Sequence, residues 1–167
     1  ADSNAHQVNP HQMRLQAQIV RQTQRALGDV LRAIEALPAD KQDWSPGPPA
    51  RSALAQLQEI AVAPGLHKLL VLGEELSPQF HMSIQAEARK LTTVAAAKEA
   101  AQKSTADLCD LILSFPDDQL DKEVTLPFGP GMVFTLADIL GLHYWNMTYH
   151  LGQINYIQTL LGDTQMH

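Results

Sequence analysis

The chain has 167 residues, of which 45% are hydrophobic and 18% are charged, so it is long enough for one folded domain and too apolar for a disordered protein. Lys and Arg number 12 against 18 Asp and Glu, which gives a net charge of −6 at pH 7 and argues against nucleic-acid binding. Cys109 is the single cysteine; it excludes an internal disulfide and suits a reducing cytoplasm. No apolar run reaches the length of a membrane span.

The first helix is predicted over residues 11–37, because apolar residues recur there at helical spacing. These residues are Met13, Val20, Leu27, Leu31, Ile34 and Leu37. Pro38 and the Pro/Gly-rich segment 39–50 end the pattern, since proline lacks the amide hydrogen that a helix needs. Residues 1–10 form a polar head outside the domain, which we expect to span residues 11–162 and to leave a tail at 163–167.

A second helix is predicted after Ser52, which is a suitable N-cap residue. Leu54, Leu57 and Ile60 give it an apolar face, and Pro64-Gly65 interrupts the pattern. The interruption predicts either a kink or two helices in series. A third helix is predicted over residues 93–115, where Pro116 ends it.

Two short β-prone runs, residues 123–126 and 132–134, flank the Pro/Gly-rich segment 127–131 and predict a small β-hairpin. Thr135 with Asp138 resembles a capping box and opens a last helix over residues 136–161. Gly162 is placed to cap its C-terminus. Long helices with short connections predict an all-α, antiparallel four-helix bundle.

Polar residues lie on the inward face of the last helix. His143, Asn146, His150 and Gln153 share that face with Leu140, Met147 and Ile154. Each buried polar group costs about 1–3 kcal/mol unless it is hydrogen-bonded. The pattern therefore indicates either a satisfied polar core or a pocket or metal site between facing helices.

The stretch from His143 to Gly162 resembles the last helix of the DinB/YfiT-like bundle superfamily, most specifically at His150, Gly152, Gln153 and Ile154. Trp44-Ser45-Pro46 and Arg51-Ser52-Ala53-Leu54 resemble that family's approach to its second helix. The resemblance implies an up-down-down-up four-helix bundle in which three histidines hold a divalent metal ion. It also implies a hydrolase or a thiol-dependent S-transferase.

Carried onto this chain, the resemblance places the family's last ligand at His150, while Asn146 and Glu59 stand where the family has histidines. His143 lies one further turn along the same face. The implied site therefore holds one divalent ion, zinc or nickel, with Glu59, Asn146, His150 and His143 as ligands, and Glu59 and His150 are the implied catalytic residues. An Asn amide is a poor ligand for zinc. Glu59 acting as a general base without metal is the other catalytic possibility.

The alternative to an enzyme is a non-catalytic bundle of the same kind, with a metal-free polar pocket that binds a small ligand or serves in a stress response. In either case the expected partner is an unidentified small molecule, together with a second copy of the chain in a homodimer. His67 is expected to be structural or exposed, and Cys109 to be a buried thiol. His6, His11, His81 and His167 are expected in loops or termini without a role.

Overall fold

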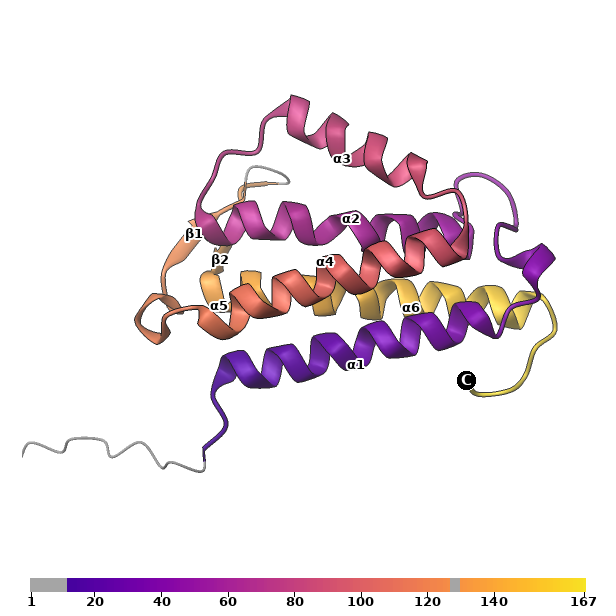
Figure 1. Cartoon of the computed structure of the whole chain (residues 1–167), viewed down its shortest axis with the longest axis horizontal. Helices are drawn as coiled ribbons and strands as arrows, with labels where there is room; N and C mark the ends of the chain where they lie inside the picture. Colours follow the sequence, from indigo (N-terminus) through magenta and orange to yellow (C-terminus); the bar gives the residue numbers. More distant parts are fainter. Residues whose placement is uncertain (1–11, 127–129) are drawn as a thin grey trace, which may run out of the picture.

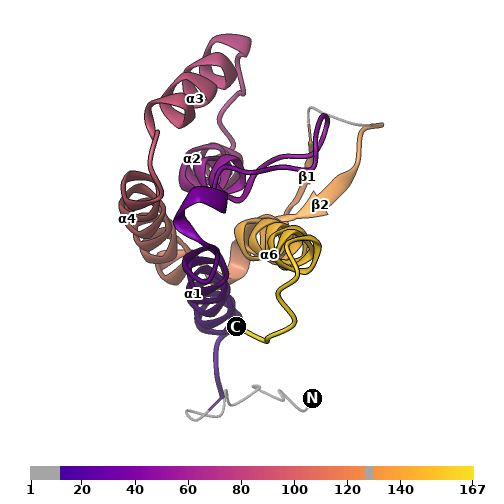
Figure 2. The same cartoon turned by 90° about the vertical axis from the view of Figure 1, so that its right-hand side faces the viewer.

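Four long helices lie side by side along the longest axis of the computed structural model (Figure 1), which describes residues 12–126 and 130–167. They are α1 (Leu15–Glu35), α2 (Ala53–Leu72), α4 (Val94–Ser114) and α6 (Leu142–Leu160). Seen end-on, α1 and α2 occupy one diagonal of the bundle, and α4 and α6 occupy the other (Figure 2). Two short 3-10 helices, η1 (Ala39–Lys41) and η2 (Asp117–Gln119), lie in the connections. The predicted four-helix bundle is confirmed.

The remaining long helix, α3 (Pro78–Lys90), explains the up-down-down-up topology. Helices α2 and α4 run in the same direction, and α3 carries the chain back between them along the outside of the bundle (Figure 1). It stands apart from the other helices in the end-on view (Figure 2) and packs mainly against α2. The expected topology is therefore correct, and α3 is the crossover that makes it possible.

Hydrophobic periodicity does not reveal α3, because none of its side chains is buried. Its start does carry a local signal: Ser77 accepts a hydrogen bond from the backbone amide of Phe80, and Pro78 occupies the first turn, as is typical of helix N-termini. The expectation that His81 lies in a loop is therefore wrong, since this residue is on α3.

The helix boundaries differ from the predicted ones at three places. Helix α1 begins at Leu15, so Met13 precedes it and is 48% exposed, not part of the buried stripe. Helix α2 continues through Pro64 as one element, which excludes two helices in series. The last predicted helix is divided at Gly141 into α5 (Leu136–Leu140) and α6.

The hairpin and the two capping sites of the last helical segment lie where the sequence predicts them. Strand β1 (Glu123–Thr125) pairs antiparallel with β2 (Val133–Thr135), and Val124 lies opposite Phe134. Part of the predicted turn, residues 127–129, lies outside the described residues. Thr135 and Asp138 form the predicted capping box, and Gly162 adopts a left-handed φ of 86°, which favours glycine at a helix C-terminus.

Several polar side chains are buried inside the bundle. They are Gln16, Thr23, Gln56, His67, Thr105, His143, His150 and Gln158. The inward direction of His143 and His150 is thereby confirmed, whereas Asn146 and Gln153 are only partly buried. Cys109 is buried as expected, and burial raises the pKa of its thiol to about 11, so the sulfur is protonated and unreactive near neutral pH.

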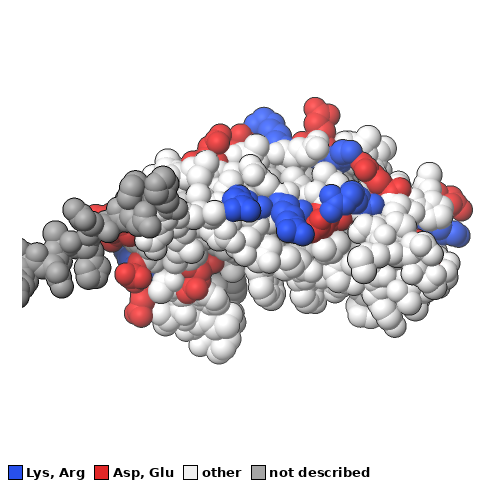
Figure 3. All heavy atoms as spheres, turned by 90° about the horizontal axis from the view of Figure 1, so that it is seen from below, with Lys and Arg blue, Asp and Glu red and all other residues white. Residues whose placement is uncertain are grey.

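The surface shows no large region of one charge on the face in Figure 3, where acidic side chains lie next to basic ones. Three ion pairs connect oppositely charged residues on or near α1: Arg14 with Asp117, Arg32 with Asp29, and Lys98 with Glu35. None of the described helices is long and apolar enough to cross a bilayer.

The predicted homodimer stays a prediction, and α6 offers the surface for it. Trp145, Tyr149 and Tyr156 are 61%, 52% and 64% exposed and follow one another at helical spacing. The rings of Trp145 and Tyr149 stack with their centroids 5.7 Å apart, and exposed apolar groups that cluster favour a protein–protein contact. Light scattering at micromolar concentration is expected to give twice the chain mass, and Tyr149→Lys is expected to lower it; a wild-type monomer would contradict the prediction.

Candidate functional site

Glu59 and His150 meet between α2 and α6, as the sequence predicts. His150 is 1% exposed, and its Nε2 lies 3.2 Å from Oε1 of Glu59. The other ring nitrogen, Nδ1, lies 2.9 Å from the side-chain oxygen of Gln56. Gln56 is one helical turn before Glu59, so α2 supplies hydrogen-bond partners to both nitrogens of the same imidazole.

A second hydrogen bond orients the side-chain amide of Gln56 toward His150. Its amide nitrogen donates to the backbone carbonyl of Arg51 at 3.3 Å, so its oxygen is left to accept from Nδ1 of His150. Nε2 of the same ring contacts the carboxylate of Glu59 at 3.2 Å. The network therefore holds the ring of His150 between the amide of Gln56 and the carboxylate of Glu59.

Arg51, which lies just before the N-terminus of α2, also belongs to the network of Glu59 and His150. Its guanidinium donates to Oε2 of Glu59. The hydrogen bond from His150 is the main reason that the pKa of Glu59 falls from 4.5 to about 2; Arg51 lowers it further, and partial burial opposes both. A carboxylate with so low a pKa is a weak base, and this disfavours the predicted role of Glu59 as a general base.

His143 does not join Glu59. Its ring is fully buried, with Nε2 2.9 Å from the hydroxyl of Thr105 on α4. His67 of α2 packs beside it, with ring centroids 5.7 Å apart. His67 is 7% exposed, so it is buried and not a surface residue, and it lines the cavity described below. The expectation that His143 shares one cleft with Glu59 and His150 is not met by these contacts.

Burial keeps both of these histidines uncharged. It lowers the pKa of His67 from 6.5 to about 4, and it lowers that of His143 to about 3, with His67 adding to the effect. In the described part of the chain, Nδ1 of each ring has no hydrogen-bond partner. Such orphaned polar atoms are uncommon in protein interiors.

The donors that this structure presents do not fit a resident divalent ion. Within residues 12–126 and 130–167, no three His, Cys, Asp or Glu side chains lie close enough together to hold a metal. Both nitrogens of His150 are already hydrogen-bonded, and the guanidinium of Arg51 lies on the carboxylate of Glu59. A metal would have to displace these contacts, and Asn146 adds only a neutral amide. The predicted zinc or nickel site stays a prediction.

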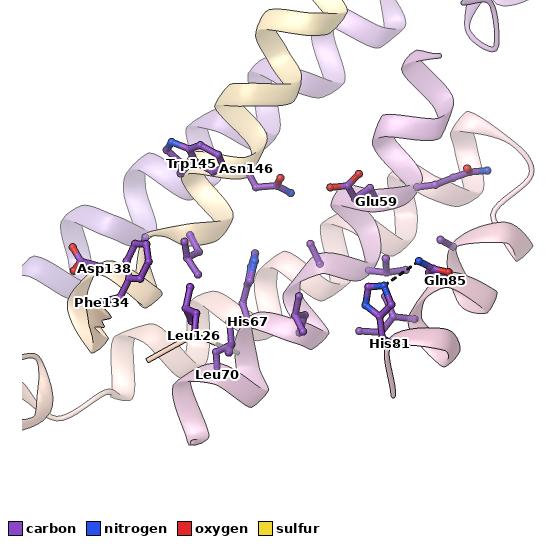
Figure 4. A pocket seen from close by; sticks show the side chains of 18 of the residues that line it. Glu59, His67, Leu70, His81, Gln85, Leu126, Phe134, Asp138, Trp145 and Asn146 are labelled. Carbon is purple, nitrogen blue, oxygen red and sulfur yellow. Dashed lines mark hydrogen bonds between the residues drawn. The ribbon is translucent and has the colours of Figure 1, made fainter. Parts of the chain in front are cut away.

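A cavity of about 1260 Å³ opens beside this network, between α2, α3, the hairpin and the junction of α5 with α6. Glu59 and Asn146 point toward one another across it from α2 and α6 (Figure 4). Near the start of α2 its lining is polar: Arg51, Gln58, Glu59, Gln85, Arg89 and Asn146. Farther along α2 the lining becomes apolar: Val62, Ala63, Leu66, Leu70, Leu126, Phe134 and Leu142.

Helix α3 forms one wall of the cavity through a single face. His81, Ile84, Gln85 and Ala88 recur at helical spacing along that wall, and Gln85 contacts His81 at 3.0 Å (Figure 4). Gln58 of α2 donates to the backbone carbonyl of Leu91 at 2.8 Å, which fixes the end of α3 against α2. Ile84, Gln85 and Ala88 escape the sequence analysis because it predicts no helix there.

Comparison with known proteins identifies the fold. No family model matches the chain, and no curated protein matches it significantly in sequence. A conserved protein from Enterococcus faecalis superposes with a TM-score of 0.68 at 15% identity, over 90% of this chain and 99% of that one. YfiT from Bacillus subtilis superposes with a TM-score of 0.57 at 15% identity, over 94% of this chain and 91% of YfiT.

The chain has the fold of YfiT. That protein is described as a probable metal-dependent hydrolase with an unusual four-helix bundle topology. The DinB/YfiT-like resemblance of the last helix is therefore confirmed at the level of the fold. At 15% identity the likeness shows the fold alone, and the chemistry depends on the residues of the site.

Proposed function

We propose that this protein binds a small, largely apolar molecule in the cavity between α2 and α3, and that it does so without a resident metal ion. The cavity itself carries the proposal. Its volume of about 1260 Å³ is somewhat above the range of about 300–1,000 Å³ that is typical of small-molecule sites, which are mainly apolar with a few convergent polar groups. The lining of this cavity has that composition.

The network at the polar end supports binding without metal. Arg51 supplies a fixed positive charge to Glu59, and His150 supplies the second hydrogen bond, so the carboxylate is neutralised by side chains of the chain itself. The metal-dependent hydrolase or S-transferase implied by the resemblance would need those contacts to open. Binding needs no such rearrangement, and we therefore favour the ligand-binding alternative.

Two Ala→Trp variants on α3 test the proposal, with N-phenyl-1-naphthylamine as a neutral apolar fluorescent probe. Ala88 lines the cavity, whereas Ala86 is exposed and lies on another face of the same helix. A tryptophan at position 88 would fill part of the cavity. We expect Ala88→Trp to weaken probe binding at least tenfold and Ala86→Trp to change it less than twofold.

Fluorescence titration measures the affinities, and circular dichroism checks that both variants retain the helix content of the wild type. Because α3 has no buried side chain, neither substitution should unfold the bundle. Equal affinities for the two variants, or no binding of the probe to the wild type, would contradict the proposal.

A further inference from the structure

The apolar half of the cavity contains one buried polar side chain that no other contact explains. Along the C-terminal half of α2, the lining residues are Val62, Ala63, Leu66, His67 and Leu70. His67 is the polar member of this set, and Figure 4 shows its ring among Leu70 and Leu126. Its ring is 7% exposed; its Nδ1 is fully buried without a hydrogen-bond partner in the described part of the chain, and its Nε2, the nitrogen left accessible to a ligand, makes no described hydrogen bond either.

The surroundings of His67 keep it in place and leave it uncharged. His143 packs against it at 5.7 Å between ring centroids and is itself held by Thr105 through a hydrogen bond of 2.9 Å. Asp138, a carboxylate that also lines the cavity, already accepts hydrogen bonds from Thr135. No described contact therefore gives His67 a charged partner.

A neutral imidazole offers one donor and one acceptor, and burying them without a partner is unfavourable. A hydroxyl or carbonyl group can satisfy such a ring, because it remains uncharged in the apolar half of the cavity. A carboxylate or an ammonium group would lose its hydration there and gain no opposite charge. The apolar half of the cavity therefore favours a molecule with a hydroxyl or carbonyl group over one of similar size with a carboxylate or ammonium group.

We propose that His67 hydrogen-bonds a hydroxyl or carbonyl group of the ligand, so that the apolar half of the cavity binds neutral, mainly apolar alcohols or ketones in preference to the corresponding acids. This proposal rests on the proposed function and specifies its ligand class. His67 is the residue that contacts the ligand, and His143 is a positioning residue that acts through it.

Displacement of N-phenyl-1-naphthylamine by 1-decanol and by decanoate tests the preference, since the two molecules have chains of equal length. Because Arg89 at the polar end of the cavity can pair with a carboxylate, the comparison is made in the Arg89→Gln background, where 1-decanol is expected to bind at least tenfold more tightly than decanoate. His67→Phe removes both hydrogen-bonding atoms and keeps an aromatic ring; it should still bind the probe, and the preference should fall below threefold. His67→Gln keeps a donor and an acceptor and should retain most of the preference.

Nuclear magnetic resonance of ¹⁵N-labelled histidine measures the chemical shifts of the ring nitrogens, which a ligand would not change if His67 were only a structural residue. Titration with 1-decanol is expected to shift the ring nitrogens of His67 and to leave those of the exposed His167 unchanged. Probe binding without a preference for 1-decanol, or an unchanged preference in His67→Phe, would overturn this proposal and leave the proposed function standing. Absence of probe binding would overturn both.

Discussion

Acidification from pH 7 to pH 5 is expected to reduce the free energy of unfolding steeply, because two buried histidines are neutral in the folded protein. The pKa values of His67 and His143 fall to about 4 and about 3 on folding. Below pH 6.5 the unfolded chain binds a proton at each residue and the folded chain does not. Each histidine then lowers the free energy of unfolding by about 1.4 kcal/mol for each pH unit of acidification. This loss continues until the pH approaches the pKa of that histidine in the folded protein.

Urea denaturation at several pH values between 7 and 5 measures this slope. His67→Phe removes one of the two titrating groups and should roughly halve it. His81→Gln is the matched control, because His81 is exposed on α3, and this substitution should leave the slope unchanged. A stability that is constant between pH 7 and 5, or an equal slope in His67→Phe, would show that the buried pair is not neutral in the fold.

His150→Leu is expected to destabilise the bundle by about 2–4 kcal/mol, because it leaves two hydrogen-bonding groups of α2 without partners. His150 is 1% exposed and binds both Gln56 and Glu59. Gln56 is also 1% exposed and has no access to water as a replacement. Leucine has a similar size, so the lost hydrogen bonds and not a new void should dominate the effect.

Arg51→Met is expected to destabilise the bundle much less than His150→Leu, although both residues contact Glu59. The Arg51 side chain is 44% exposed, and an ion pair of that exposure contributes less than about 1 kcal/mol. A double-mutant cycle with Gln56→Leu and His150→Leu should give a coupling energy of at least about 1 kcal/mol. Additive effects of these two substitutions would contradict the network, as would an Arg51→Met effect equal to that of His150→Leu.

The sequence predicts the bundle well, because α1, α2, α4 and α6 each bury residues that recur at helical spacing, mostly apolar in α1, α2 and α4 and mixed apolar and polar in α6. It does not predict α3, which buries no side chain and so shows no face to recognise. Its local signal, Ser77 followed by Pro78, is too short to establish a helix without such a face.

The candidate site is predictable in part, and the reason lies in helix geometry. Spacing on α6 places His143 and His150 on the inward face, but it does not tell which neighbouring helix each ring reaches. His150 reaches Gln56 and Glu59 on α2, whereas His143 reaches Thr105 on α4. Arg51 precedes α2, so no helical periodicity indicates that it contacts Glu59.

The most direct test of metal-free binding is titration of N-phenyl-1-naphthylamine into wild-type protein before and after treatment with EDTA, and again with added zinc or nickel. Arg51 and His150 already neutralise Glu59, so we expect the same Kd in all conditions, within about twofold, and no bound metal after purification. Binding of the probe that disappears with EDTA and returns with zinc or nickel would contradict the account.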